Sequence, residues 1–402
     1  MKAEGHRPSE LTMPRYLQLG SIPPKRHTAH RVQPGYKNEG IFYEEVVSTQ
    51  GFNRAYSIVY HLRPPTRVKA IETAGEMRAD AAELHLLRHV HLKTLAIPTQ
   101  GDPVTGRVPM LTNADVTLWR CRPAEPQKEL FRNATADEVI FVHHGRGQLL
   151  THFGVLNFKP FDYIVIPRCT TYELKFDTGT QAELLVIESR TNIGFPNRYL
   201  NDDGQFRLGA PYSERDIHGP SKLVTRDEER EVPVVIKDGA RLTRYTLMHH
   251  PFDVVGWDGF VYPFTFNADD FEPITGTVHQ PPPIHQTFDS HGGFVICTFA
   301  PRFLDHHPDA VKVPYAHSNV ESDEVLYYVR GKFGSRRGVE ESSFTLHPHG
   351  IPHGPHPGTL GASWKMDRTD ELAVMVDTFR PLHVTKQSLA YDDPTYPFSW
   401  QD

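Results

Sequence analysis

The sequence is poor in cysteine and has no long apolar run. Three of the 402 residues are cysteine, and Cys121, Cys169 and Cys297 lie far apart. This spacing excludes a disulfide framework and a zinc ribbon, and it fits a reducing compartment. No run approaches the ~20 apolar residues of a membrane span, and the N-terminus lacks the apolar region of a secretory signal. We therefore expect a soluble, cytoplasmic protein.

The chain also carries little net charge. The formal charge is -6 and the sequence pI is about 6.5. Because neither value indicates a basic surface, we expect no nucleic acid and no anionic membrane among the partners. At 402 residues the chain is long enough to bury a substantial core, in one large domain or two of ordinary size.

Long helices are not expected either. The 34 prolines and 29 glycines favour many turns, and residues 79–92 form the one modest helix candidate. Short β-rich runs such as residues 41–49 and 56–64 are separated by turn signals, as in hairpins. Strands of this length and spacing predict a mainly β fold of the sandwich or barrel type.

Histidine, in contrast, is abundant, with 24 residues. In residues 315–357, His317 precedes Glu324 by seven positions, and a glycine turn separates them from a cluster of His347, His349, His353 and His356. Two imidazoles and one carboxylate on adjacent strands bind one face of Fe(II) and leave the other open for substrate and dioxygen. We therefore predict an iron(II) site in this stretch.

The two halves of the chain resemble each other. ADEVIFVHHGRG at 136–147 corresponds to SDEVLYYVRG at 322–331, and each phrase is followed by a strand that ends near a proline. The pattern resembles the cupin double-stranded β-helix, which makes the chain a bicupin with little helix. The competing interpretation is that both phrases are a common strand-and-turn sequence.

The alignment of the repeats predicts only one working metal site. When Glu138 is placed opposite Glu324, Phe131 lies opposite His317, and Tyr172 lies opposite His353 when the later prolines are matched. The N-terminal copy therefore keeps the glutamate and lacks both histidines. Residues 191–230 are loop-like, which is typical of a linker. The expected organisation is an N-terminal arm (1–40), a cupin half without metal ligands (41–200), a cupin half with the iron site (230–380) and a C-terminal tail (381–402).

Over most of its length the sequence resembles the homogentisate 1,2-dioxygenase family. The resemblance is strongest over residues 253–356, which contain DVVGWDG, PPPIHQTF, PYAHSNVESDE, RGKF and LHPHGIPHGP. Residues Pro23 to Thr28 are similar to the short bacterial branch of this family. The resemblance implies cleavage of homogentisate by O2 to maleylacetoacetate, with Fe(II) as cofactor, in tyrosine and phenylalanine catabolism. It also implies a homo-oligomer, either a trimer or a hexamer.

The resemblance also assigns roles to individual residues. His317, Glu324 and His353 match the iron ligands, although the spacing of the first two is one residue longer than usual, which a bulge would absorb. His285 matches an active-site histidine, and an imidazole there suits proton transfer. His347 matches the histidine that orients a ligand or the substrate, and His353 also borders the substrate.

One position departs from the family. Phe333 stands where the family has a tyrosine that contacts substrate, so Tyr327 or Tyr328 is a candidate replacement. This departure leaves open a related dioxygenase for another para-diol, such as gentisate. Ordinary core packing is the competing role for Phe333.

The residues alone do not exclude a non-catalytic bicupin or a manganese enzyme. His317 and Glu324 would in the first case be a surface ion pair on a hairpin. Several histidines also have rivals for the roles given above. The rivals are His349 and His356 for His353, and His279 and His291 for His285.

Overall fold

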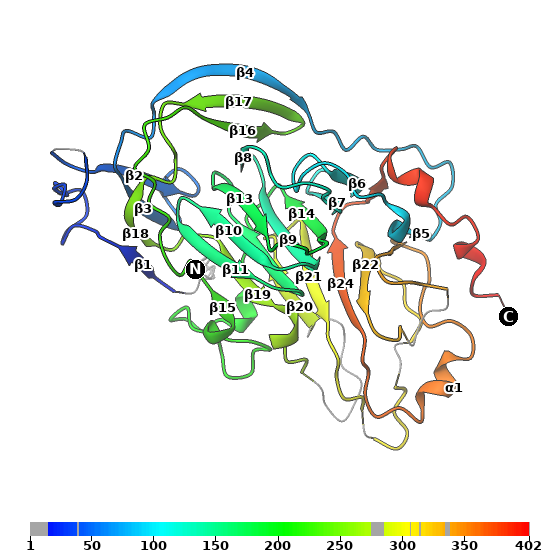
Figure 1. Ribbon diagram of the computed structural model, residues 1–402. Helices are drawn as coiled ribbons and strands as arrows, with labels where there is room; N and C mark the ends of the chain where they lie inside the picture. The colour runs from blue at the N-terminus through cyan, green and yellow to red at the C-terminus, as the bar shows by residue number, and fades with distance from the viewer. Residues whose placement is uncertain are drawn as a thin grey trace, which may run out of the picture. The chain divides into compact units, whose positions relative to one another are not determined.

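The computed structural model describes residues 15–37, 40–274, 285–305, 307–312, 315–333 and 338–401. Its regular structure is almost entirely β (Figure 1), which confirms the prediction of a mainly β bicupin with little helix. Within the described residues the one α-helix is α1 (Thr359–Ser363). Short 3-10 turns occur at η1 (Thr94–Ala96), η2 (Asn197–Tyr199), η3 (Glu214–Asp216), η4 (Ala268–Asp270), η6 (Ser388–Tyr391) and η7 (Tyr396–Phe398).

The backbone contacts divide the chain into two compact units. Unit 1 comprises the described parts of Met1–Met77, Pro126–Thr180 and Asn192–Phe266. Unit 2 comprises those of Arg78–Glu125, Gln181–Thr191 and Asn267–Asp402. These units interleave along the chain, whereas the predicted halves, 41–200 and 230–380, are continuous. The difference arises because strands pair with partners that are distant in sequence.

Unit 1 contains two complete sheets. The four-stranded sheet has the order β1 (Leu17–Gly20), β18 (Val254–Gly259), β3 (Tyr56–His61), β2 (Tyr43–Ser48). The seven-stranded sheet has the order β11 (Gly154–Phe158), β10 (Gly147–Thr151), β13 (Thr171–Phe176), β8 (Leu130–Asn133), β16 (Val232–Asp238), β17 (Arg241–Leu247), β4 (Val68–Glu76). Strands β2 and β3 form the predicted hairpin. Strand β1 lies in the predicted N-terminal arm, where the backbone of residues 17–20 pairs with β18.

Four further strands of unit 1 lie in one sheet. Their order is β15 (Ile217–His218), β19 (Phe264–Asn267), β12 (Asp162–Ile166), β9 (Asp137–His144). Every residue of β12 is buried, and so is every residue of β9 except the last, as expected of strands that are covered on both faces. The predicted linker 191–230 is not a free connection, because its aromatic side chains pack in this unit. Phe195, Tyr199, Phe206 and Tyr212 are buried against one another.

Unit 2 contains the six-stranded sheet that carries the predicted iron site. Its order is β20 (Gln286–Asp289), β21 (Phe294–Phe299), β24 (Leu372–Thr378), β22 (Asp323–Arg330), β23 (Phe344–His347), β5 (Val90–Leu92). Strands β22 and β24 lie side by side in Figure 1 and pair in antiparallel register. Four more strands of this unit pair in the order β14 (Glu183–Ser189), β7 (Val116–Cys121), β6 (Arg107–Thr112), β25 (His383–Val384).

The predicted helix at residues 79–92 is wrong. The segment is irregular until β5, which adds to the edge of the six-stranded sheet by pairing Leu92 with Phe344. Farther upstream, the backbone N–H of Ala82 donates to the carbonyl of Val384. These long-range backbone partners override the local helix propensity. None of the described helices is long and apolar enough to cross a bilayer.

Candidate metal centre

His317, Glu324 and His353 meet in unit 2. His317 and His353 form an isolated antiparallel bridge, with backbone N–O distances of 2.8 and 2.9 Å in the two directions. Nε2 of each ring lies 3.6 Å from a carboxylate oxygen of Glu324, on the central strand β22. One ligand atom from each of the three residues lies within 4.8 Å of the others. Among the described residues this is the single group of its kind, so the three side chains could share one metal ion.

The two imidazole rings are oriented for metal binding by the backbone. Nδ1 of His353 lies 3.1 Å from the carbonyl oxygen of Ile351, and Nδ1 of His317 lies 3.3 Å from that of Tyr315. A carbonyl only accepts, so each Nδ1 carries the proton and each Nε2 keeps its lone pair. Nε2 of His353 is buried, with no hydrogen-bond partner in the described part of the chain. An orphaned buried acceptor of this kind fits a metal ligand.

His347 hydrogen-bonds the carboxylate of Glu324 and is itself hydrogen-bonded by Tyr396. Its Nδ1 lies 2.8 Å from Oε1 of Glu324, and its Nε2 lies 3.0 Å from the hydroxyl of Tyr396. Because the carboxylate only accepts, Nδ1 donates to Glu324, and the Tyr396 O–H donates to Nε2. The ring is fully buried and stacks on His353 at a centroid distance of 4.6 Å. This contact set suits a histidine that orients a ligand.

Tyr396 belongs to the segment 381–402, which is predicted from sequence to be a C-terminal tail. That prediction is wrong for the part around Tyr396, because its ring is buried and packs on His91 and Trp400. The aromatic residues in TYPFSW are the one signal of packing in this segment. Local sequence does not place them beside His347, because the contact joins residues 49 positions apart.

The charge state of Glu324 follows from these neighbours. Burial raises the pKa of its carboxyl, but the three histidines around it hold the pKa well below its usual range. These histidines are His317, His347 and His353, of which His347 donates a hydrogen bond to the carboxylate. Glu324 is therefore an anion at neutral pH, as a metal ligand must be.

A second carboxyl lies across the strand pair and was not predicted. Asp377 on β24 is the register partner of Glu324, so their side chains share one face of the sheet. Burial, and then the charge of Glu324, raise the pKa of Asp377 to about 8, while His317 lowers it. In the metal-free protein this carboxyl keeps its proton at neutral pH, whereas a nearby cation would lower its pKa.

The contacts of the clustered histidines show which of them faces Glu324. Nδ1 of His349 lies 2.7 Å from Asp323, and Nε2 of His356 lies 2.8 Å from the hydroxyl of Ser399. These rings are engaged elsewhere, whereas the ring of His353 faces Glu324. The geometry therefore favours His353 over its two rivals.

The structure places His285 immediately before β20, buried and stacked on Phe299 at a centroid distance of 4.6 Å. The prolines before it and its rival His279 lie outside the described residues. His291 occupies a turn with a positive φ of 53° after β20. The catalytic role of His285 stays a prediction.

Phe333 packs edge to face on Tyr328 at a centroid distance of 4.7 Å. Alternation along β22 puts Tyr328 on the same face as Glu324, and Tyr327 on the opposite face. Tyr327 there lies under the guanidinium of Arg120, 5.0 Å from its ring centre. Of the two candidate replacements for the family tyrosine, Tyr328 is thus on the appropriate face. The substrate contact of Phe333 stays a prediction.

The N-terminal copy of the repeat has the same register without the metal site. Tyr172 pairs with Phe131, as His353 pairs with His317, and Glu138 pairs with Ile166, as Glu324 pairs with His347. The hydroxyl of Tyr172 donates to the buried carboxylate of Glu138. A tyrosine hydroxyl thus satisfies the glutamate that histidines surround in the other copy.

The sheets and the three-residue group together define a mainly β protein with a 2-His-1-carboxylate constellation. The family model for the N-terminal part of homogentisate 1,2-dioxygenase matches residues 49–268, more than half of the chain. A protein of Saccharolobus solfataricus that is named provisionally as a dioxygenase is 40% identical over 96% of this chain and 98% of its own length. The chain therefore belongs to the homogentisate 1,2-dioxygenase family, and its general class is that of a dioxygenase.

Two more distant similarities also extend over most of the chain. Homogentisate 1,2-dioxygenase from Rhodopseudomonas palustris is 24% identical, over 93% of this chain and 87% of its own. Among solved structures, a conserved-barrel cupin protein from Leptotrichia buccalis covers 74% of this chain and 100% of its own, with a TM-score of 0.35 and 9% identity. That TM-score is too low to add to what the sheets themselves establish.

Proposed function

We propose that this protein is an Fe(II)-dependent dioxygenase that cleaves the ring of homogentisate to give maleylacetoacetate. Both atoms of O2 enter the product, so the reaction needs no external reductant. The observation that carries the proposal is the group of His317, Glu324 and His353, in which Nε2 of each ring lies 3.6 Å from one carboxylate. Two imidazoles and a carboxylate suit Fe(II) and leave coordination positions for substrate and O2. Mn(II) suits the same ligands, and metal analysis separates the two.

When bound, iron would supply a site at which the phenolate and O2 are held side by side. The protein would hold that ion through His317, Glu324 and His353. His347 donates to the Glu324 carboxylate and accepts from Tyr396, so that the carboxylate keeps one orientation. The largely buried positions of Glu324 and His353 limit access of water to the reacting groups.

Proton transfer has two candidate groups. The phenol must lose a proton to bind as phenolate, and an imidazole near neutral pKa suits that role. We assign it to His285, which the family resemblance selects and which is buried immediately before β20. Asp377, the register partner of Glu324, is the second group that can hold a proton in this region.

The test is O2 consumption by anaerobically purified, iron-loaded protein. We expect one O2 consumed per homogentisate, an absorbance rise from the enol product, and loss of both in Glu324→Ala. The matched control is His383→Ala, an exposed histidine of the same unit. Turnover of gentisate but not homogentisate would support the iron site and contradict the proposed substrate. Phe333 would then be the first residue to exchange for tyrosine. An iron-loaded protein that consumes no O2 with any diol would support the non-catalytic bicupin.

A further inference from the structure

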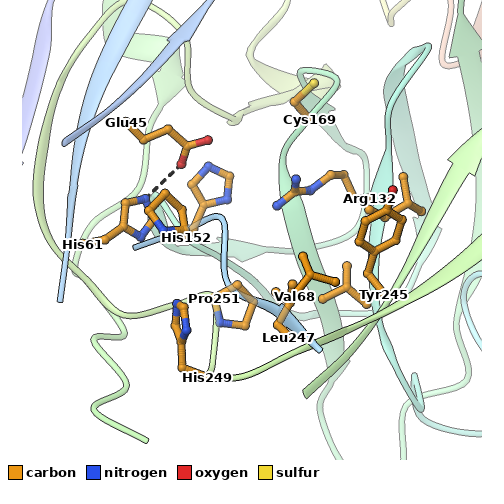
Figure 2. Close-up of a pocket in the computed structure, with 13 residues that line it drawn as sticks. Glu45, His61, Val68, Arg132, His152, Cys169, Tyr245, Leu247, His249 and Pro251 are labelled. Atoms are coloured by element: carbon orange, nitrogen blue, oxygen red, sulfur yellow. Dashed lines mark hydrogen bonds and ion pairs between the residues drawn. The ribbon is translucent and has the colours of Figure 1, made fainter. Parts of the chain in front are cut away.

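Unit 1 contains a cavity that the proposed reaction does not use. Its volume is about 220 Å³, and its walls come from the two sheets of that unit. Glu45 and His61 enter from the four-stranded sheet, whereas Arg132 and Leu247 enter from the seven-stranded sheet (Figure 2). Sites for drug-sized ligands are typically ~300–1,000 Å³, so this cavity suits a smaller molecule.

One wall is a charged network that is already satisfied. The two ring nitrogens of His61 lie 2.7 Å from Asp253 and 3.0 Å from Glu45. Burial lowers the pKa of His61, but these two hydrogen bonds raise it more, to about 9. The pKa of Glu45 falls to about 2, because its bond to His61 outweighs its own burial. This wall is therefore an imidazolium held between two carboxylates, with an overall charge of -1.

Opposite this network lies Arg132, whose charge contributes to lowering the pKa of Glu45. Nε of Arg132 donates to the hydroxyl of Thr171 at 2.8 Å, which fixes the plane of the guanidinium. No carboxylate of the described residues lies within ion-pair distance of it, and its side chain is only half-buried. Figure 2 shows the guanidinium extending from β8 into the cavity. Two terminal NH2 groups in a fixed plane match the two oxygens of a carboxylate.

His152 provides a further donor beside this arginine. Its ring lies between Glu45 and Arg132 in Figure 2, and the residue is 6% exposed. Burial lowers the pKa of His152 to about 3, so the ring is neutral. Nδ1 accepts from the backbone N–H of Thr171 at 3.3 Å, so the proton resides on Nε2. Nε2–H is therefore a neutral donor at the polar end of the cavity.

The remaining wall is apolar. Val68, Leu247 and Pro251 group together below the polar residues in Figure 2, and Val234 and Ile236 of β16 also line the cavity. One end thus offers charged and neutral donors, and the other offers aliphatic surface beside the buried ring of His249.

We propose that this cavity binds a small organic carboxylate with an apolar body, such as a single-ring aromatic acid. The carboxylate pairs with the guanidinium of Arg132 and accepts from Nε2–H of His152, while the ring packs on Val68 and Leu247. A metal ion is not the expected occupant, because the described residues offer no three-ligand group here. The site is independent of the iron centre and of the reaction proposed for it.

Cys169 provides a local readout of occupancy. It lines the cavity and is exposed, whereas Cys121 and Cys297 are buried. The experiment follows alkylation of Cys169 by iodoacetamide in the full-length protein, by peptide mass spectrometry, with phenylacetate as the probe. We expect phenylacetate to slow alkylation in a saturable manner. The uncharged isostere phenylacetamide should protect at least tenfold more weakly, because it cannot form an ion pair with Arg132.

Arg132→Gln should weaken protection by phenylacetate at least tenfold, whereas Arg146→Gln, at an exposed position in the same unit, should leave it unchanged. If Arg132→Gln does not fold by circular dichroism, Val68→Phe serves instead. Its 37% exposed position tolerates a larger side chain, which narrows the cavity and should also reduce protection. Calorimetric titration of phenylacetate, compared between the wild-type protein and Arg132→Gln, provides the second measurement.

Three results would overturn the assignment. The first is no protection and no binding heat with millimolar phenylacetate. The second is protection that survives in Arg132→Gln. The third is equal protection by inorganic phosphate, which would show an anion site without selection for an apolar body. Loss of O2 consumption at the iron site would not bear on any of these outcomes.

Discussion

The hydroxyl of Tyr396 lies 3.0 Å from Nε2 of His347, and the other nitrogen of that ring lies 2.8 Å from Glu324. A residue near the C-terminus thus orients the carboxylate of the candidate metal centre through one histidine. Tyr396 reaches Glu324 only through this chain of hydrogen bonds, so it acts by positioning.

Removing this support should weaken metal binding without abolishing it. We expect His347→Ala to lower Fe(II) affinity by ~10–100-fold, the usual effect of losing such a partner. Tyr396→Phe should cost less, because the imidazole stays in place. Competition with a chromophoric chelator measures both, and Tyr391→Phe is the control in the neighbouring 3-10 turn. Unchanged affinity in His347→Ala would contradict this arrangement.

Fe(II) should stabilise the folded protein through His353 and not through its neighbour His349. Ligand binding to the native state at 100 times Kd contributes about 2.7 kcal/mol. Anaerobic Fe(II) should therefore raise the melting temperature of the wild-type protein and of His349→Ala, but not that of His353→Ala. Scanning calorimetry with and without a chelator gives the comparison. If the rise in melting temperature disappears only in His349→Ala, His349 and not His353 is the metal ligand.

Unit 1 should lose stability as pH rises through the titration of His61. The folded-state pKa is about 9, against an ordinary histidine pKa of 6.5, so the stabilisation is complete below pH 6.5 and is lost as pH rises through 9. The shift corresponds to at most about 3 kcal/mol. Urea unfolding between pH 6 and 10, in wild type and His61→Gln, measures it. An equal pH slope in the two proteins would assign the dependence to other groups.

Breaking the buried ion pair of unit 2 should be costly. Arg120 is fully buried and lies 3.1 Å from Glu183, and it also covers the ring of Tyr327. Arg120→Ala leaves a buried carboxylate with one partner fewer and should cost ~3–5 kcal/mol of unfolding free energy. The exposed pair of Arg78 and Asp80 provides the contrast, since water screens it and Arg78→Ala should cost far less unfolding free energy. Denaturant unfolding tests both, and equal losses would refute the distinction.

Short-range sequence patterns were sufficient to predict the fold class and the candidate metal ligands of this protein. The alternation and turn spacing of the β runs predicted a mainly β chain, and the DEV phrases located equivalent strands in both halves. The pair His317 and Glu324, with the histidine cluster, defined the candidate metal site, because ligand types and the repeat alignment are written in the sequence itself.

Other features depended on contacts that join distant residues. Residues 79–92 have helical composition, but β5 pairs with β23 instead, and the backbone partner decides the conformation. The Tyr396 contact, the Asp377 register and the cavity of Arg132 each join segments separated by tens of residues or more. Sequence determined which chemical groups were present. Only tertiary structure decided which of them meet, because strand pairing sets the distances between side chains.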